Sequence, residues 1–237
     1  MENIAVCNVR NFVVMGHTGS GKTTLADALL FKLGMNNRLG SVDDETSMSD
    51  FTDEEKSRKI SIFAKPFGAV YKTKSGEKLK LVFTDTPGYM DFWGQVIAGA
   101  RSADAGLIVV DASSGIQVGT HHAWKCCQKY GLTARGIVIT MLDKENTDYS
   151  GTLKDIQSAF GANCVPVVMP LSGKSGVVDV LEEKNIPDEM AEQVENAKNV
   201  LIESAAETDD LLTEKYLDGQ ELSTEDLSKG LRAAVAG

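Results

Sequence analysis

The segment from Asn11 to Leu33 constrains the fold of this chain more than any other part of the sequence. An apolar run, Asn11 to Met15, is followed by Gly-His-Thr-Gly-Ser-Gly-Lys-Thr at residues 16–23, and leucines and alanines then recur at helical spacing. A strand, a glycine-rich loop and a helix in this order are the context in which the pattern G-x-x-x-x-G-K-[ST] binds phosphate. We therefore predict an α/β fold in which a P-loop joins the first strand to the first helix.

The chemistry of this loop follows from its residue types. Glycines let backbone N–H groups converge on phosphate oxygens at the positive end of a helix. The Lys22 ammonium would neutralise charge on the outer phosphates during catalysis, and the Thr23 hydroxyl would ligate Mg²⁺. We expect a purine nucleoside triphosphate to contact Gly16, His17, Thr18, Gly19, Ser20, Gly21, Lys22, Thr23 and Thr24.

A second motif, Asp85-Thr86-Pro87-Gly88, follows the apolar run Leu81 to Phe83. Asp85, at the end of that predicted strand, would hold a water molecule on Mg²⁺, and the N–H of Gly88 would touch a γ-phosphate. The pattern D-x-x-G alone is usually only a turn. After a P-loop it indicates a GTPase, and we therefore include Asp85 and Gly88 in the predicted nucleotide site.

The composition excludes several other classes of function. The formal net charge is -10 and no run of lysines and arginines could follow a phosphate backbone, so we expect no autonomous nucleic-acid binding. The four cysteines form no C-x-x-C pair, and the adjacent Cys126 and Cys127 cannot share an unstrained disulfide, which indicates reduced thiols and a cytoplasmic protein. The longest apolar runs have strand length, so we expect no membrane span. We also expect a monomer.

The order of apolar segments predicts a mixed, mainly parallel sheet with helices on both faces. Ile60 to Tyr71 and Leu79 to Thr84 are predicted as an antiparallel pair of strands joined by a polar turn. After this pair we predict helices at Phe92 to Arg101 and Val118 to Tyr130, and strands at Gly106 to Asp111 and Gly136 to Met141.

The acidic, aperiodic segment from Asp43 to Glu55 is predicted as a mobile loop that buries little surface. It ends in Thr52-Asp53-Glu54-Glu55, which has the spacing of a capping box. A short helix should therefore begin at this point.

The alternation of strands and helices weakens in the last third of the chain. We predict a GTPase core at residues 1–161 and an inserted α/β subdomain at residues 162–237. The predicted elements of this part are helices at Tyr149 to Phe160, Pro187 to Tyr216 and Leu222 to Val235, and strands at Val165 to Met169 and Val177 to Leu181.

Several segments together resemble the GTPase domain of elongation factor G. They are Gly16 to Thr24, Asp85 to Phe92, Ala105 to Asp111 and Leu142 to Asn146. Arg58 to Ile62 and the tyrosine after D-T-P-G are similar to the elongation factor G-like paralogues, and residues 201–207 and 214–217 are similar to the helical insert of that domain. The resemblance covers nearly the whole chain. It implies a P-loop GTPase fold, GTP and GDP as ligands, Mg²⁺ as cofactor, and a role in protein biosynthesis as a cytoplasmic translation factor on the ribosome.

The resemblance also implies roles for single residues. Ser61 matches the threonine of the first switch, whose hydroxyl ligates Mg²⁺, and Asp143 matches the aspartate that reads guanine. Thr140 and Met141 stand where the family has asparagine and lysine, so part of the guanine site is changed. Tyr89 stands where the family has the histidine that orients the attacking water, and we name it as a catalytic candidate.

Two further differences concern the nucleotide site and the insert. Gly19 replaces an aspartate of the true elongation factors, and the sequence stops at Gly237, before the family's last guanine-binding loop. In elongation factor G the insert contacts the ribosomal stalk protein, so the acidic face of Pro187 to Glu221 is a candidate surface for that partner.

Two other readings remain open from the sequence. The chain could be a nucleotide-gated binding module with negligible hydrolysis or relaxed base specificity, which the changes at Tyr89, Thr140 and Met141 favour. An ATP-using P-loop enzyme is the other, and it rests on the altered base-recognition residues alone.

Overall fold

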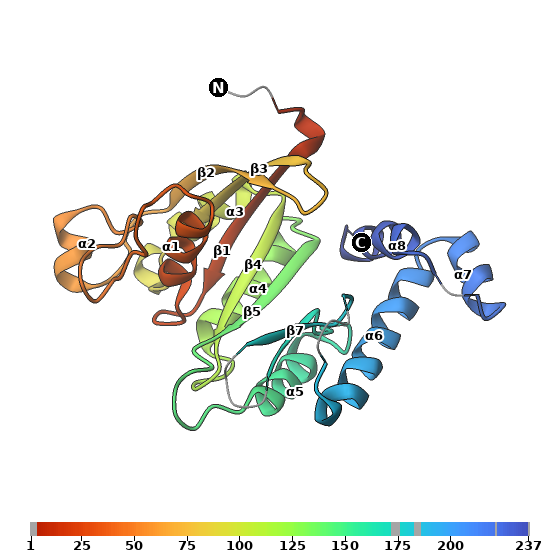
Figure 1. Cartoon of the computed structure of the whole chain (residues 1–237). Coiled ribbons are helices and arrows are strands. Elements are labelled where there is room, and N and C mark those ends of the chain that lie inside the picture. The colour runs from red at the N-terminus through yellow and green to blue at the C-terminus, as the bar shows by residue number, and fades with distance from the viewer. Residues whose placement is uncertain (1–3, 172–175, 183–185, 221, 237) are drawn as a thin grey trace. The chain divides into compact units, whose positions relative to one another are not determined.

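The computed structural model describes residues 4–171, 176–182, 186–220 and 222–236. The chain forms two compact units, which divide between Thr147 and Asp148. Figure 1 labels most of the helices and strands of both units. Each unit is described by itself below.

The first unit is built on a five-stranded sheet with the strand order β2-β3-β1-β4-β5. The strands are β1 (Val9–Gly16), β2 (Lys65–Lys72), β3 (Lys78–Asp85), β4 (Ala105–Asp111) and β5 (Ala134–Thr140). β1 pairs in parallel with β3 and β4, β4 pairs in parallel with β5, and only the β2–β3 pair is antiparallel. The predicted mixed, mainly parallel sheet is confirmed.

Helices cover both faces of this sheet (Figure 1). The covering helices are α1 (Lys22–Lys32), α3 (Trp93–Ser102) and α4 (Val118–Lys129). The unit also contains the short helix α2 (Asp53–Arg58) and the 3₁₀ turns η1 (Val6–Asn8) and η2 (Met90–Phe92). Successive side chains of a strand point to opposite faces. Val13 and Met15 of β1 therefore pack with Val96 of α3 and Ala123 of α4, whereas Phe12 packs on the α1 side.

The strand predicted from Ile60 begins only at Lys65. The intervening backbone has other partners: the N–H groups of Ile62 and Phe63 donate to the Glu55 carboxylate, and that of Ala64 donates to the Gln95 side chain. Donors that are bonded to side chains cannot join the ladder with β3. The predicted start of this strand at Ile60 was therefore wrong, because residues 60–64 lie outside it.

The predicted capping box is confirmed at the start of α2. The Glu55 N–H donates to Thr52 Oγ1 at 3.2 Å, and the Thr52 N–H donates to Glu55 Oε2 at 3.3 Å. These reciprocal bonds satisfy two N–H groups that the first turn of a helix leaves without partners.

The second unit contains a two-stranded antiparallel sheet and four α-helices among its described residues. Its elements are α5 (Tyr149–Phe160), β6 (Val168–Pro170), β7 (Val177–Asp179), η3 (Asp188–Met190), α6 (Ala191–Ala206), α7 (Asp210–Leu217) and α8 (Thr224–Ala236). Met169, Val178 and Val194 lie in its buried core. The long helical stretch predicted from Pro187 to Tyr216 is interrupted, because the Asp209 side chain accepts the Leu211 N–H and begins a new helix.

By its contacts α5 belongs to the second unit. The division into a core at residues 1–161 and an insert at residues 162–237 stays a prediction about domain organisation. No helix in the described ranges is both long and apolar enough to cross a lipid bilayer.

Candidate functional site

The loop between β1 and α1 has a backbone that only glycine accommodates at its key points. A Cβ on Gly16 would lie 2.5 Å from the Val109 carbonyl oxygen, so the loop passes against β4 at that residue. Gly19 and Gly21 have φ angles of 73° and 85°, in the left-handed region that favours glycine. Gly21 provides no side-chain cap for α1, so the N–H groups of the first turn remain available to an anion.

Lys22 is the first residue of α1, directly after this loop, and is only 5% exposed. Its Nζ donates to the carbonyl oxygen of His17 at 2.5 Å. Burial lowers the pKa of Lys22 to about 8, although the nearby Asp85 carboxylate acts in the opposite direction. A buried ammonium of this kind is stabilised by an anion such as phosphate.

His17 and Thr24 differ in their surroundings. The Gly119 N–H of α4 donates to His17 Nδ1 at 3.3 Å, and burial and the charge of Lys22 lower the pKa of His17. The neutral imidazole therefore joins the loop to α4. Thr24 is exposed on α1.

Three predicted metal ligands, far apart in sequence, lie together beside the loop. Thr23 Oγ1 donates to Asp85 Oδ2 at 2.9 Å and lies 2.9 Å from Ser61 Oγ. The Ser61 hydroxyl also contacts a carboxylate, that of Asp50, to which it donates at 2.8 Å. Each hydroxyl has only one hydrogen to donate. Because Ser61 donates to Asp50, its Oγ turns a lone pair toward Thr23 Oγ1.

This arrangement fits Mg²⁺. Two ligands at right angles around Mg²⁺, each about 2.1 Å from the ion, lie about 3 Å apart, which matches the separation of the Thr23 and Ser61 oxygens. Asp85 Oδ1 is buried and has no hydrogen-bond partner among the described residues. Burial raises the pKa of Asp85, and hydrogen bonds from Ser49 and Thr23 and the charge of Lys22 oppose this change. A cation, or water molecules on it, would satisfy this oxygen set.

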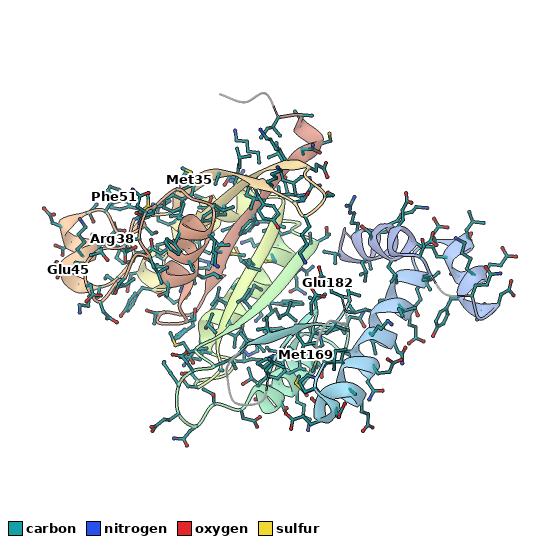
Figure 2. All side chains as sticks on the ribbon, in the orientation of Figure 1. Met35, Arg38, Glu45, Phe51, Met169 and Glu182 are labelled. Atoms are coloured by element: carbon teal, nitrogen blue, oxygen red, sulfur yellow. The ribbon has the colours of Figure 1, made fainter. Side chains whose placement is uncertain are left out.

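The segment before α2 contributes residues that the sequence did not identify. Ser49 Oγ donates to Asp85 Oδ2 at 2.5 Å, and Asp50 accepts from Ser61. Ser47, Ser49 and Asp50 are 7%, 0% and 3% exposed. The prediction that this acidic segment buries little was therefore wrong for Ser47, Ser49 and Asp50. Figure 2 labels Glu45 and Phe51 in the same segment, and both are exposed.

Asp27 of α1 holds this segment in place. Its Oδ1 accepts the Met48 N–H at 2.9 Å, and a Cβ on Gly40 would lie 2.7 Å from its carboxyl carbon. Asp27 is 1% exposed and lies one helical turn after Thr23. The sequence did contain a signal for this contact: Asp27 stands among the apolar residues of the helix. A carboxylate buried at such a position requires a hydrogen-bond donor from a neighbouring segment.

Behind Ser61, Asp50, Glu55 and Lys65 form a buried cluster that we call the Lys65 ion network. Lys65 Nζ lies 2.6 Å from Glu55 Oε1 and 2.9 Å from Asp50 Oδ1, and the three side chains are at most 7% exposed. Burial raises the pKa of Glu55, but hydrogen bonds from Lys65 and from the N–H groups of Ile62 and Phe63 outweigh it and lower that pKa to about 2.

The D-T-P-G turn lies directly against the P-loop. Thr86 Oγ1 donates to the Val14 carbonyl of β1 at 2.6 Å and fixes the turn to the central strand. A Cβ on Gly88 would lie 2.6 Å from Thr18 Cα and 2.7 Å from Lys22 Nζ. The backbone of Gly88 therefore lies directly beside Thr18 and Lys22. Its contact with a γ-phosphate stays a prediction. Tyr89 follows it and is 41% exposed.

The residues predicted to read the base lie at the end of β5. Thr140 Oγ1 lies 2.8 Å from the Ser20 carbonyl oxygen, so the residue in the asparagine position contacts the P-loop. Met141 has a φ of 57°, and its terminal methyl lies beside Gly21. Asp143 is exposed, and the following Lys144 forms an ion pair of 3.3 Å with Asp111 of β4. This ion pair, which the sequence did not suggest, joins the Asp143 turn to the sheet.

We predict that Glu55→Gln lowers the free energy of unfolding by about 2 kcal/mol at neutral pH, because a charged partner of buried Lys65 is lost. The folded-state pKa of Glu55 lies below its ordinary value of 4.5. Its contribution is therefore complete above that value and is lost as the pH falls toward 2. Urea unfolding should show that the free energy of unfolding decreases less between about pH 7 and about pH 3 in the variant than in the wild type.

The matched control is Glu54→Gln, because Glu54 pairs with Arg58 at an exposed position of the same helix. It should change the free energy of unfolding by less than about 0.5 kcal/mol. An equal decrease in the free energy of unfolding between the two pH values in wild type and Glu55→Gln would contradict the lowered pKa of Glu55.

Comparison with known proteins identifies the family to which this chain belongs. The family model described as the elongation factor Tu GTP binding domain matches residues 7–223. Elongation factor G from Mycoplasma pneumoniae is 31% identical over 254 residues, an alignment that covers 100% of this chain and 36% of that protein. Elongation factor G from Thermotoga neapolitana is 30% identical over 245 residues, covering 96% of this chain and 34% of that protein.

The structural comparison agrees. A crystal structure of a protein from Thermus thermophilus superposes with a TM-score of 0.86 at 36% sequence identity, and the match covers 96% of this chain and 36% of that one. The chain therefore spans about a third of the length of the curated relatives that it matches. The resemblance to elongation factor G and the fold class are both confirmed. This chain belongs to the family of elongation factor Tu GTP-binding domains.

Proposed function

We propose that this chain binds GTP with Mg²⁺ and hydrolyses it as the GTPase domain of an elongation factor G-like translation factor that acts on the ribosome. The observation that carries the proposal is the convergence of Lys22, Thr23, Ser61, Asp85 and Gly88 on one loop. These residues come from three separate segments of the chain, and a nucleoside triphosphate with its metal is the ligand that uses all of them.

Each group would act by position and charge. The N–H groups at the start of α1 and the Lys22 ammonium would hold the β- and γ-phosphates. Thr23 and Ser61 would hold Mg²⁺ directly and Asp85 would hold it through water; when bound, the ion neutralises charge on the phosphates. Gly88 would present its N–H to the γ-phosphate, and Tyr89 would orient the attacking water.

Partners of the complete protein form part of this proposal. The ribosome is the proposed partner, and the chain itself would remain monomeric and cytoplasmic. Glu192, Glu195 and Glu203 are exposed on α6, which supports contact of this acidic helix with a basic surface such as the ribosomal stalk protein.

Replacing Lys22 tests the phosphate assignment. Lys22→Ala removes the cation that faces the β- and γ-oxygens, so we predict a loss of GTP affinity of roughly a hundredfold. Lys32→Ala, at the exposed end of the same helix, is the matched control and should leave affinity unchanged. Titration calorimetry measures both. Equal affinities for wild type and Lys22→Ala would refute the proposed phosphate site.

The altered base-recognition residues predict weak discrimination between GTP and ATP. Thr140 contacts the P-loop with a hydroxyl and has no amide for the base, and Met141 offers only a thioether stem. The double variant Thr140→Asn/Met141→Lys should raise the ratio of GTP to ATP affinity by roughly tenfold. Competition binding measures this ratio. A wild-type chain that already prefers GTP by several powers of ten would show that Asp143 suffices.

Tyr89 separates a GTPase from a nucleotide-gated module that does not hydrolyse. If the phenol orients water, Tyr89→Phe should lower single-turnover GTP cleavage by roughly one to two powers of ten, about 1.4 kcal/mol for each tenfold, and leave affinity unchanged. The measurement is made with and without ribosomes. Equal cleavage rates for wild type and Tyr89→Phe in both settings would remove Tyr89 from the catalytic residues.

A further inference from the structure

The direction of the Ser61 hydroxyl depends on Asp50. A carboxylate accepts hydrogen bonds and cannot donate, so the bond of 2.8 Å between them uses the only hydrogen of the hydroxyl. The lone pairs of Ser61 Oγ are then left facing Thr23 Oγ1 at 2.9 Å. If the hydroxyl turned its hydrogen toward Thr23 instead, it would present a positive dipole to the candidate metal site.

Lys65 fixes the carboxylate that receives this hydrogen. Its Nζ lies 2.9 Å from Asp50 Oδ1, the same oxygen that accepts from Ser61. Both side chains are almost fully buried, at 7% and 4% exposed, so water does not compete freely for either charge. The ring of Phe51 lies over the ammonium at 5.9 Å from its centroid and covers it further.

Lys65 also fixes the backbone around Ser61. Its Nζ lies 2.6 Å from Glu55 Oε1, which accepts the N–H groups of Ile62 at 2.8 Å and Phe63 at 3.2 Å. These are the two residues that follow Ser61. The Ser61 side chain, through Asp50, and the backbone directly after Ser61, through Glu55, are therefore both held by the Lys65 ammonium.

The backbone of Lys65 is held in the β-sheet. Lys65 is the first residue of β2 and lies opposite Asp85 in the register of the β2–β3 pair. The same strand pair thus carries both Asp85 and the lysine that controls Ser61. Any displacement of Lys65 relative to Asp85 requires a change in the ladder of β2 and β3.

We propose that Lys65 is a positioning residue that, through Asp50 and Glu55, directs the lone pairs of Ser61 toward the divalent cation of the triphosphate-bound state. This inference rests on the proposed GTP and Mg²⁺ binding. In GTPases the first switch contacts the metal only while the γ-phosphate is present and is released after hydrolysis. Lys65 should therefore strengthen metal binding in the triphosphate complex and leave the diphosphate complex unaffected.

The test uses Mn²⁺ as the metal, because its binding is measured directly by electron paramagnetic resonance. Mn²⁺ affinity is determined for the chain saturated with GDP and for the chain saturated with a non-hydrolysable GTP analogue. Lys65→Met keeps the length of the apolar stem and removes the three N–H donors. We expect it to weaken Mn²⁺ binding in the analogue complex roughly tenfold, because Ser61 is no longer oriented toward the metal. Mn²⁺ binding in the GDP complex should remain unchanged.

The matched control is Lys72→Met, which removes a lysine from the exposed end of the same strand and should change neither complex. The double variant Glu55→Gln/Lys65→Met serves if the single variant fails to fold, because it removes opposite charges together and leaves less unpaired charge buried. It should show the same selective loss in the analogue complex.

Three outcomes overturn the inference. Unchanged Mn²⁺ affinity in the analogue complex would show that Ser61 is directed without Lys65. An equal loss in both complexes would show a general effect on the fold. A wild-type chain that binds neither the analogue nor Mn²⁺ with it would refute the proposed function itself, and this result is distinguished from the others because the wild type alone reveals it.

Discussion

The parallel pairing of β1 with β3 is the constraint on which the rest of the site depends. It places Val14 beside Asp85, and Thr86 then reaches back to the Val14 carbonyl. Because β4 and β5 run in the same direction, the loops that follow all four strands emerge at one edge of the sheet. The phosphate loop, the D-T-P-G turn and the Thr140 turn are neighbours for this reason.

Local chemistry explains why much of this unit could be predicted from the sequence. The P-loop and the capping box at Thr52 are defined by residue types at short, fixed spacing, and the sheet by apolar runs of strand length. The segment around Ser49 and Asp50 could not be predicted in the same way. It is held by Asp27 and Asp85, which are distant in sequence, and it has no periodicity to indicate its burial.

Glu55 illustrates the limit of such predictions. Its place in a capping box was visible in the sequence, and that role uses Oε2. Its other oxygen accepts from Lys65 and from the backbone after Ser61, and this second role depends on where the sheet begins. The same contacts keep the N–H groups of Ile62 and Phe63 out of the strand ladder, so the late start of β2 and the unforeseen ion network share part of their physical origin.

The glycines at positions 19 and 88 both belong to the proposed phosphate site, yet they restrict mutation for different reasons. At Gly19 no atom lies within 4 Å of an added Cβ, and the only obstacle is the φ of 73°. Asparagine and aspartate adopt that conformation more readily than other residues, so the aspartate of the true elongation factors fits this position without a change of backbone. At Gly88 the obstacle is space between two loops, and no side chain of any chemistry removes it. In this chain, position 19 therefore has room for an aspartate or asparagine side chain, whereas any side chain at position 88 would displace the adjacent P-loop.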